Sequence, residues 1–202
     1  MTARVLHLFP TPVIVDDLPG AEKLNGELEV AILEQQRRDA GLKLSNRGGW
    51  QSKRDFRSWA GDTGNRVIEH AIALANSGTG HRQDRPAPQW HVDVWANVSS
   101  SGAFNMPHIH GGSFWSAVYY VRAGDGEGGQ LVLHDPRMPS LRMHAPGLRF
   151  KDAGPDVRAE IQPKSGLIIL FPAWLSHSVE PWQGEGHRIS VAMNIRAAPV
   201  RG

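Results

Sequence analysis

Three histidines of this sequence are placed so that they could bind one metal ion. His108 and His110 are two residues apart, and on an extended strand residues i and i+2 point to the same side. His177 comes much later, after the apolar run 166–171 and a turn-like Pro-Ala-Trp. Imidazole suits iron, zinc, copper and nickel, and three ligands leave positions free for substrate or dioxygen. A closed structural zinc site would usually need four ligands including cysteine, and the chain has no cysteine.

A cation and a hydroxyl follow the third histidine. Arg188 and Ser190 are again two residues apart, so they share one face of a predicted strand whose other face is apolar. A guanidinium fork beside a hydroxyl suits a carboxylate, which accepts two charge-assisted hydrogen bonds from the arginine and one from the serine. A half-exposed strand on which Arg188 pairs with Glu185 explains the same residues equally well.

Six stretches, taken together and in order, resemble the iron(II)/2-oxoglutarate-dependent oxygenases, and most closely a group of uncharacterised bacterial proteins in that superfamily. The stretches are 95–98, 105–110, 116–121, 128–137, 171–179 and 187–191. They lie between about residue 90 and residue 195. The resemblance implies an α+β fold, mainly β: a double-stranded β-helix, or jelly roll, with N-terminal helices packed on one sheet.

The resemblance also implies cofactors and a role for each candidate residue. Fe(II) would be bound by His108, His110 and His177, and the far carboxylate of 2-oxoglutarate by Arg188 and Ser190. The implied function is that of a non-haem dioxygenase that uses both cofactors and dioxygen to hydroxylate a small molecule or a peptide.

Four further residues are candidates for lining the site. Asn97 and Tyr120 are expected in the cosubstrate pocket, and Trp95 and Arg137 in the substrate pocket. For Tyr120 simple core packing is an equally good interpretation, and for Arg137 a solvated loop charge is the safer one.

His110 departs from the superfamily's usual pattern, which is His-x-Asp or His-x-Glu before the distal histidine. A neutral imidazole there makes the metal complex one unit more positive and changes its metal preference and redox potential. Asp93 and Asp135 are alternative carboxylate ligands, which we rank below His110. For Asp93, together with His91, a solvated strand surface is the more natural interpretation.

Two other functions agree with the same residues. One is a cupin-type dioxygenase with three histidine ligands, in which the substrate chelates the metal and no 2-oxoglutarate is consumed. The other is a non-catalytic jelly roll that binds a small acidic ligand, with histidines that are structural or hold zinc.

Length and composition predict a single domain. The 202 residues, 40% of them hydrophobic, are enough for one hydrophobic core. Within this single domain (1–202), we expect an N-terminal strand and helices in 1–88 and a jelly-roll core that carries the metal site in 89–198. The net charge is only +2, and the basic residues are scattered along the chain among acidic ones. We therefore expect no nucleic-acid partner. Without a signal-like or membrane-spanning segment we expect a cytoplasmic protein. A homodimer is compatible with these features.

Periodicity predicts the elements that surround the site. We expect a strand at 11–15, a helix at about 21–39, and a second helix that contains 67–75 and ends near 76–78. The segment 41–64 is polar and rich in glycine, arginine and tryptophan, and residues 50–59 within it should be irregular. Short strands and turns follow from residue 89. Residues 50–59 and 138–158 are where we would expect the substrate to be chosen.

Overall fold

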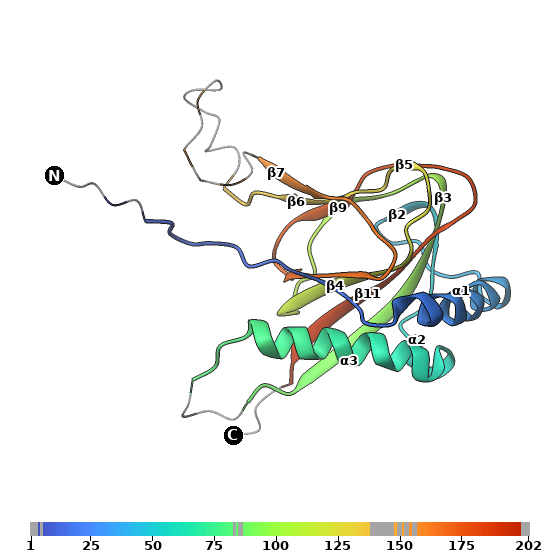
Figure 1. The fold of residues 1–202 in the computed structure, drawn as a ribbon, viewed down its shortest axis with the longest axis horizontal. Coiled ribbons are helices and arrows are strands. Elements are labelled where there is room, and N and C mark those ends of the chain that lie inside the picture. The colour runs from blue at the N-terminus through green and yellow to red at the C-terminus, as the bar shows by residue number, and fades with distance from the viewer. Residues whose placement is uncertain are drawn as a thin grey trace.

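The predicted α+β, mainly β class is confirmed by the structure, a computed structural model that describes residues 4, 6–82, 84, 87–137, 148, 151, 154 and 157–198. Three helices and eleven strands lie in this described part (Figure 1). The helices are α1 (Ala21–Arg38), α2 (Phe56–Trp59) and α3 (Gly61–Gly78). The strands are β1 (Ile14–Asp17), β2 (Asn46–Gln51), β3 (Trp90–His108), β4 (Trp115–Arg122), β5 (Glu127–Gly128), β6 (Leu131–His134), β7 (Arg158–Ile161), β8 (Leu167–Pro172), β9 (His177–Val179), β10 (Trp182–Gln183) and β11 (Arg188–Ala197).

Nine strands form one antiparallel sheet that curls into two layers. The strand order is β1-β8-β4-β11-β3-β9-β6-β7, and β2 is added on β3. The long strand β3 belongs to both layers, because its first half pairs with β11 and its last residues pair with β9. In Figure 1 the strands β6, β7 and β9 lie apart from β4 and β11, and β3 connects the two groups. This is the curled architecture expected of a jelly roll.

The larger layer consists of β1, β8, β4, β11 and the first half of β3, to which β2 is added. Along its strands, successive side chains point alternately to two different environments. On β11 the residues Ile189, Val191, Met193 and Ile195 belong to the core beneath the helices. The residues between them, including Arg188 and Ser190, point to the inside of the roll. A separate apolar cluster that includes Tyr120, Ile169 and Phe171 also lies there. One face of these strands therefore supports the fold, and the other lines the interior.

The two long helices cover the outer face of this layer (Figure 1). Leu24, Leu28 and Ile32 of α1 and Val67 and Ile68 of α3 are buried in the core beneath the helices, as the apolar spacing predicts. Both predicted helices are thus confirmed, α1 to within one residue at its end. Within the described residues, no helix is long and apolar enough to cross a membrane.

Two predictions about the N-terminal part were wrong. The first strand begins at Ile14 and continues through Asp17, because its extent is set by pairing with β8 rather than by its own residues. The segment 50–59 is not irregular throughout, since it contains the end of β2 and the whole of α2. Strand β2 forms despite its two glycines because its backbone pairs with β3, and Gly48 adopts a φ of 72° beside Ala103.

Candidate metal centre

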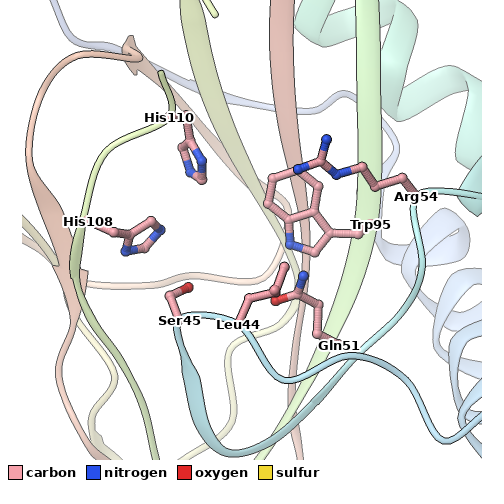
Figure 2. A pocket seen from close by; sticks show the side chains of 7 residues that line it. All are labelled: Leu44, Ser45, Gln51, Arg54, Trp95, His108 and His110. Carbon is pink, nitrogen blue, oxygen red and sulfur yellow. The ribbon is translucent and has the colours of Figure 1, made fainter. Parts of the chain in front are cut away.

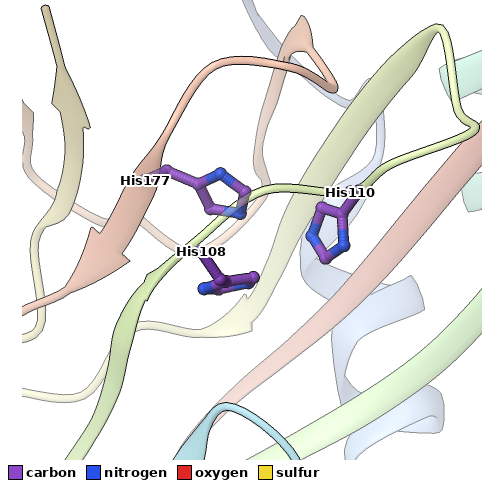
Figure 3. A group of neighbouring side chains, drawn as sticks. All are labelled: His108, His110 and His177. Carbon is purple, nitrogen blue, oxygen red and sulfur yellow. The ribbon is translucent and has the colours of Figure 1, made fainter. Parts of the chain in front are cut away.

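Strand pairing brings the three predicted metal ligands together. His108 is the last residue of β3 and lies directly opposite His177, the first residue of β9. His110 follows β3, and its ring lies 4.9 Å from the His108 ring and 5.0 Å from the His177 ring, centroid to centroid. Figure 3 shows the three rings converging on one region. Neighbours in space thus come from segments far apart in sequence.

The position of His110 depends on a turn and not on the strand. The His110 amide donates to the Ala173 carbonyl at 2.9 Å, at the end of β8, and its own carbonyl accepts from Ser113 at 3.3 Å. The turn is closed by Gly112, whose φ of 81° favours glycine. The i, i+2 spacing predicted both histidines on one extended strand. In the structure His110 lies just beyond that strand, and its ring still turns toward the other two.

Hydrogen bonds orient two of the imidazoles for metal binding. The Nδ1 atom of His108 lies 2.7 Å from the Met106 carbonyl, and the Nδ1 atom of His177 lies 2.9 Å from the Leu175 carbonyl. A carbonyl only accepts, so in each ring Nδ1 carries the proton and Nε2 presents its lone pair. Such backbone contacts are the usual way in which a protein fixes the tautomer of a ligating histidine.

Burial keeps these imidazoles neutral, which is the form that binds metal. It lowers the pKa of His110 to about 4, helped by the charges of His108 and Arg54. It lowers the pKa of His177 to about 3, and the pKa of His108 is also below its usual value. The candidate ligand atoms of the three lie within 4.8 Å of one another. Two nitrogens at about 2.1 Å from one ion are at most about 4.2 Å apart, so small ring rotations suffice. The triad therefore fits Fe(II).

The predicted anion clamp lies inside the roll and is buried. Arg188 is only 3% exposed, and its Nε has no hydrogen-bond partner in the part of the chain that the structure describes. Its guanidinium carbon lies 5.1 Å from the ring centroid of Tyr120, whose buried hydroxyl also has no partner. Burial raises the pKa of Tyr120, and the charge of Arg188 opposes that rise. Buried polar groups are nearly always hydrogen-bonded, so two unpartnered neighbours indicate a missing acceptor, such as a carboxylate.

Four polar side chains form a row across the inner face of the larger layer. Gln51 of β2 lies opposite Asn97 of β3, Asn97 opposite Ser190 of β11, and Ser190 opposite Tyr120 of β4. Residues that face each other across neighbouring strands point to the same side of a sheet. The structure therefore brings together the predicted residues Asn97, Tyr120 and Ser190, and it adds Gln51.

Two neighbours of Arg188 were not singled out from the sequence. A Cβ at Gly129 would lie 3.2 Å from the Nε of Arg188, so the chain passes the guanidinium closely, with a φ of 71°. Trp182 packs beside the same glycine, and its indole nitrogen is buried without a partner. The Gly128-Gly129 pair was visible as a turn signal, whereas nothing local marks Trp182.

A pocket of about 150 Å³ opens beside two of the histidines (Figure 2). The residues that line it are Leu44, Ser45, Gln51, Arg54, Trp95, His108 and His110. Trp95, a predicted pocket residue, forms one wall, with its ring 5.8 Å from that of His110. Gln51 and Arg54 come from the segment 50–59, which was predicted to choose the substrate without a role for any single residue. The other such region, 138–158, lies largely outside the described residues.

Neither alternative carboxylate joins the histidine triad. Asp93 accepts hydrogen bonds from Arg54 at 3.1 Å and from Arg196 at 3.0 Å. Asp135 accepts two from the Arg137 side chain, at 3.0 and 2.9 Å. Among the described residues, the only group of three or more candidate ligands is the triad itself. Arg137 is exposed and does not line the pocket beside the triad, and its role stays a prediction.

Several solved structures have a fold similar to that of this chain. A prolyl hydroxylase from Trichoplax adhaerens in complex with a hypoxia inducible factor oxygen degradation domain peptide has a TM-score of 0.66 and 13% identity, over 92% of this chain and 83% of that one. The viral collagen prolyl hydroxylase of Paramecium Bursaria Chlorella virus-1, in a 2-oxoglutarate complex, has a TM-score of 0.61 and 16% identity, over 93% and 96%. HygX from Streptomyces hygroscopicus, with nickel and 2-oxoglutarate bound, has a TM-score of 0.61 and 17% identity, over 93% and 84%.

The family itself is shown by a sequence match. The comparison with curated proteins found no match. A family model described as "Putative 2OG-Fe(II) oxygenase" matches residues 93–194, which is half of the chain and includes every residue predicted for the site. The match does not favour a cupin-type dioxygenase or a non-catalytic jelly roll. The chain therefore belongs to the 2OG-Fe(II) oxygenases.

Proposed function

We propose that His108, His110 and His177 hold the Fe(II) of this oxygenase, with His110 in the position where the family usually has a carboxylate. The observation that carries the proposal is the convergence of three neutral imidazoles, within 4.8 Å of one another, at the end of a roll that also encloses a buried arginine. No other group of candidate ligands of this size lies in the described part of the chain.

We further propose that Arg188 and Ser190 bind the far carboxylate of 2-oxoglutarate, with Tyr120 and Asn97 beside it. The unpartnered Arg188 Nε and Tyr120 hydroxyl support this assignment, because a carboxylate would satisfy both. Its charge would also offset that of the buried guanidinium, which has no carboxylate partner within the described residues. Gly129 keeps this side of the guanidinium free of a side chain.

The protein's own residues position the reactants and keep the ligands in the correct protonation state. When bound, the metal and 2-oxoglutarate supply the oxidising chemistry, in which dioxygen, 2-oxoglutarate and a substrate C–H group give succinate, carbon dioxide and a hydroxylated product. The Met106 and Leu175 carbonyls hold the protons of His108 and His177 on Nδ1, away from the metal. The apolar cluster around Tyr120 excludes water from the clamp.

The substrate of the proposed hydroxylation is a small molecule or a peptide that reaches the triad through the pocket lined by Trp95 and Arg54. We propose that residues 1–202 act as one domain. The core that contains α1 and α3 also contains residues of β3, β4 and β11, which supports this view.

Anaerobic titration of the metal-free protein with Fe(II) and then with 2-oxoglutarate tests the proposal. We expect a weak visible charge-transfer band when the 2-oxo acid chelates the iron. In Arg188→Ala the 2-oxoglutarate concentration for half-saturation should rise about tenfold or more, since hydrogen bonds to charged groups contribute roughly 1.5–3 kcal/mol. Arg158→Ala, which changes an exposed arginine of β7 paired with glutamates, should titrate like the unchanged protein. Iron binding without a band would overturn the assignment of the cosubstrate.

A further inference from the structure

Among the described residues that line the pocket beside the triad, one side chain is charged and none is a carboxylate. Arg54 supplies that charge, and the other residues that line the pocket are leucine, serine, glutamine, tryptophan and the two histidines. Arg54 is half-exposed, with 57% of its side chain accessible. Figure 2 shows its guanidinium beside the Trp95 ring, on the wall facing His110. The positive charge therefore lies within the space that a substrate would enter.

The charge of Arg54 is not cancelled by its ion pair. Arg54 donates to Asp93 Oδ2 at 3.1 Å, and Arg196 donates to the other oxygen of the same carboxylate at 3.0 Å. Two guanidinium groups thus share one carboxylate, which leaves the cluster with one net positive charge.

On the same side, a divalent cation bound to the triad would add positive charge. Its three ligands are neutral imidazoles, so no protein carboxylate offsets a bound divalent cation. An anionic group in the pocket would be attracted both by Arg54 and by the metal centre. A carboxylate on the triad would have weakened that attraction.

The pocket wall also offers polar groups and an apolar surface. The Gln51 amide and the Trp95 indole nitrogen have no hydrogen-bond partner among the described residues, although both side chains are largely buried. The guanidinium carbon of Arg54 lies 5.9 Å from the Trp95 ring centroid, a distance at which the ring supports the cation. Leu44 is exposed and also lines the pocket. These features suit a ligand with an anionic end and an apolar body.

We propose that this pocket binds a carboxylate of the prime substrate, with Arg54 as its ion-pair partner and Trp95 and Leu44 in contact with an apolar body. Asp93 is a positioning residue, because it holds Arg54 against the Trp95 wall. The substrate class is therefore a carboxylic acid with an apolar group. This inference rests on the proposed oxygenase function, since it assigns the substrate side of the same site.

Binding of phenylacetate to the metal-free protein tests the proposal without any need for turnover. Isothermal titration should give a Kd for phenylacetate about tenfold lower than that for its neutral amide, phenylacetamide, as one charge-assisted pair implies. Arg54→Gln should remove this preference and leave phenylacetamide binding unchanged. Arg57→Gln should bind phenylacetate normally, because this nearby arginine donates to Asn65 and does not line the pocket.

A second variant separates the pocket from the 2-oxoglutarate clamp. Phenylacetate should bind Arg188→Ala as well as it binds the unchanged protein, and saturating 2-oxoglutarate should not displace it. Loss of binding in either case would mean that phenylacetate occupies the clamp, and it would overturn the proposal. No saturable binding up to about 10 mM, or tighter binding of inorganic phosphate than of phenylacetate, would also overturn it.

The two proposals fail in different ways. If the Fe(II)–2-oxoglutarate band is absent while phenylacetate binding depends on Arg54, the cosubstrate assignment is wrong and the carboxylate pocket stands. If the band forms normally and Arg54→Gln binds phenylacetate as tightly as the unchanged protein, the oxygenase assignment stands and the carboxylate pocket is wrong.

Discussion

The two faces of the larger layer differ in whether their buried polar atoms are hydrogen-bonded. On the outer face, beneath the helices, the Tyr119 hydroxyl donates to the Asn25 side chain at 2.6 Å. On the inner face, the next residue, Tyr120, has a buried hydroxyl with no partner. The other unpartnered buried side-chain atoms of β4 and β11 are also at inner-face positions: Ser116, Arg188, Asn194 and Arg196.

This difference separates the residues that stabilise the fold from those that await a ligand. An unpartnered buried donor or acceptor costs about 1–3 kcal/mol, so a fold selected for stability alone would not collect several of them on one face. The outer face is filled with apolar side chains such as Ile189 and Val191, which are fully buried. We infer that apolar burial on the outer face offsets the free-energy cost of the unpartnered polar atoms inside. Bound cofactors and substrate would supply the missing hydrogen-bond partners.

The largest expected effect tests whether the inner face needs its metal. Fe(II) at about a thousand times its Kd should raise the free energy of unfolding by about 4 kcal/mol, because it binds only the folded state. In His177→Ala this increase should disappear, since only two ligands remain. Anaerobic urea unfolding with and without Fe(II) measures both values.

His134→Ala is the matched control for this experiment. His134 lies on the neighbouring strand β6, where its ring is hydrogen-bonded to Ser178 at 3.0 Å, and it is not part of the triad. The increase should persist in this variant. If His177→Ala kept the full increase, the metal would bind elsewhere.

The second prediction compares neighbours on opposite faces of β11. Ile189→Ala should lower the free energy of unfolding by roughly 3 kcal/mol, because it leaves a cavity in the core beneath the helices. The half-saturating 2-oxoglutarate concentration should stay unchanged. Arg188→Ala should show the reverse pattern, with weak 2-oxoglutarate binding and little loss of stability. Equal effects of both variants on 2-oxoglutarate binding would contradict the separation of the two faces.

Some residues predicted for the centre have a local spacing signal, whereas Trp95, Asn97 and Tyr120 were expected from the family resemblance. The Arg188/Ser190 pair depends only on strand geometry, and strand β11 supplies it. The His108/His110 pair has the same spacing, but β3 ends at His108 and a turn positions His110. The apolar spacing of α1 and α3 is likewise a local property, and both helices were predicted close to their observed limits.

What the sequence did not predict depends on pairing between distant segments. Strand β2 is polar and glycine-containing, and only its register with β3 places Gln51 opposite Asn97. Arg54 gains its place from Asp93 and Trp95, neither of which is near it in sequence. The unpartnered state of Tyr120 follows from burial, which no single-strand pattern reveals.

The smallest expected effect comes from the adjacent tyrosines and differs in sign between them. Tyr119→Phe should lower the free energy of unfolding by about 1–2 kcal/mol, because it leaves the buried Asn25 amide oxygen without its donor. Burial raises the pKa of Tyr119 to about 12, so the hydroxyl keeps its proton and donates throughout the usual pH range. Tyr120→Phe should leave stability unchanged or raise it by up to about 0.5 kcal/mol, since it removes an unsatisfied hydroxyl.

The 2-oxoglutarate titration reverses the order of these two variants. Tyr120→Phe should raise the half-saturating concentration a few-fold, because one hydrogen bond to a carboxylate is lost, and Tyr119→Phe should not change it. Urea unfolding of the metal-free variants gives the two free energies of unfolding, and the charge-transfer titration gives the two half-saturating 2-oxoglutarate concentrations. If Tyr120→Phe destabilised the metal-free protein as much as Tyr119→Phe, the inner hydroxyl would already be satisfied without a ligand. The contrast between the faces would then rest on the unpartnered atoms of Ser116, Arg188, Asn194 and Arg196.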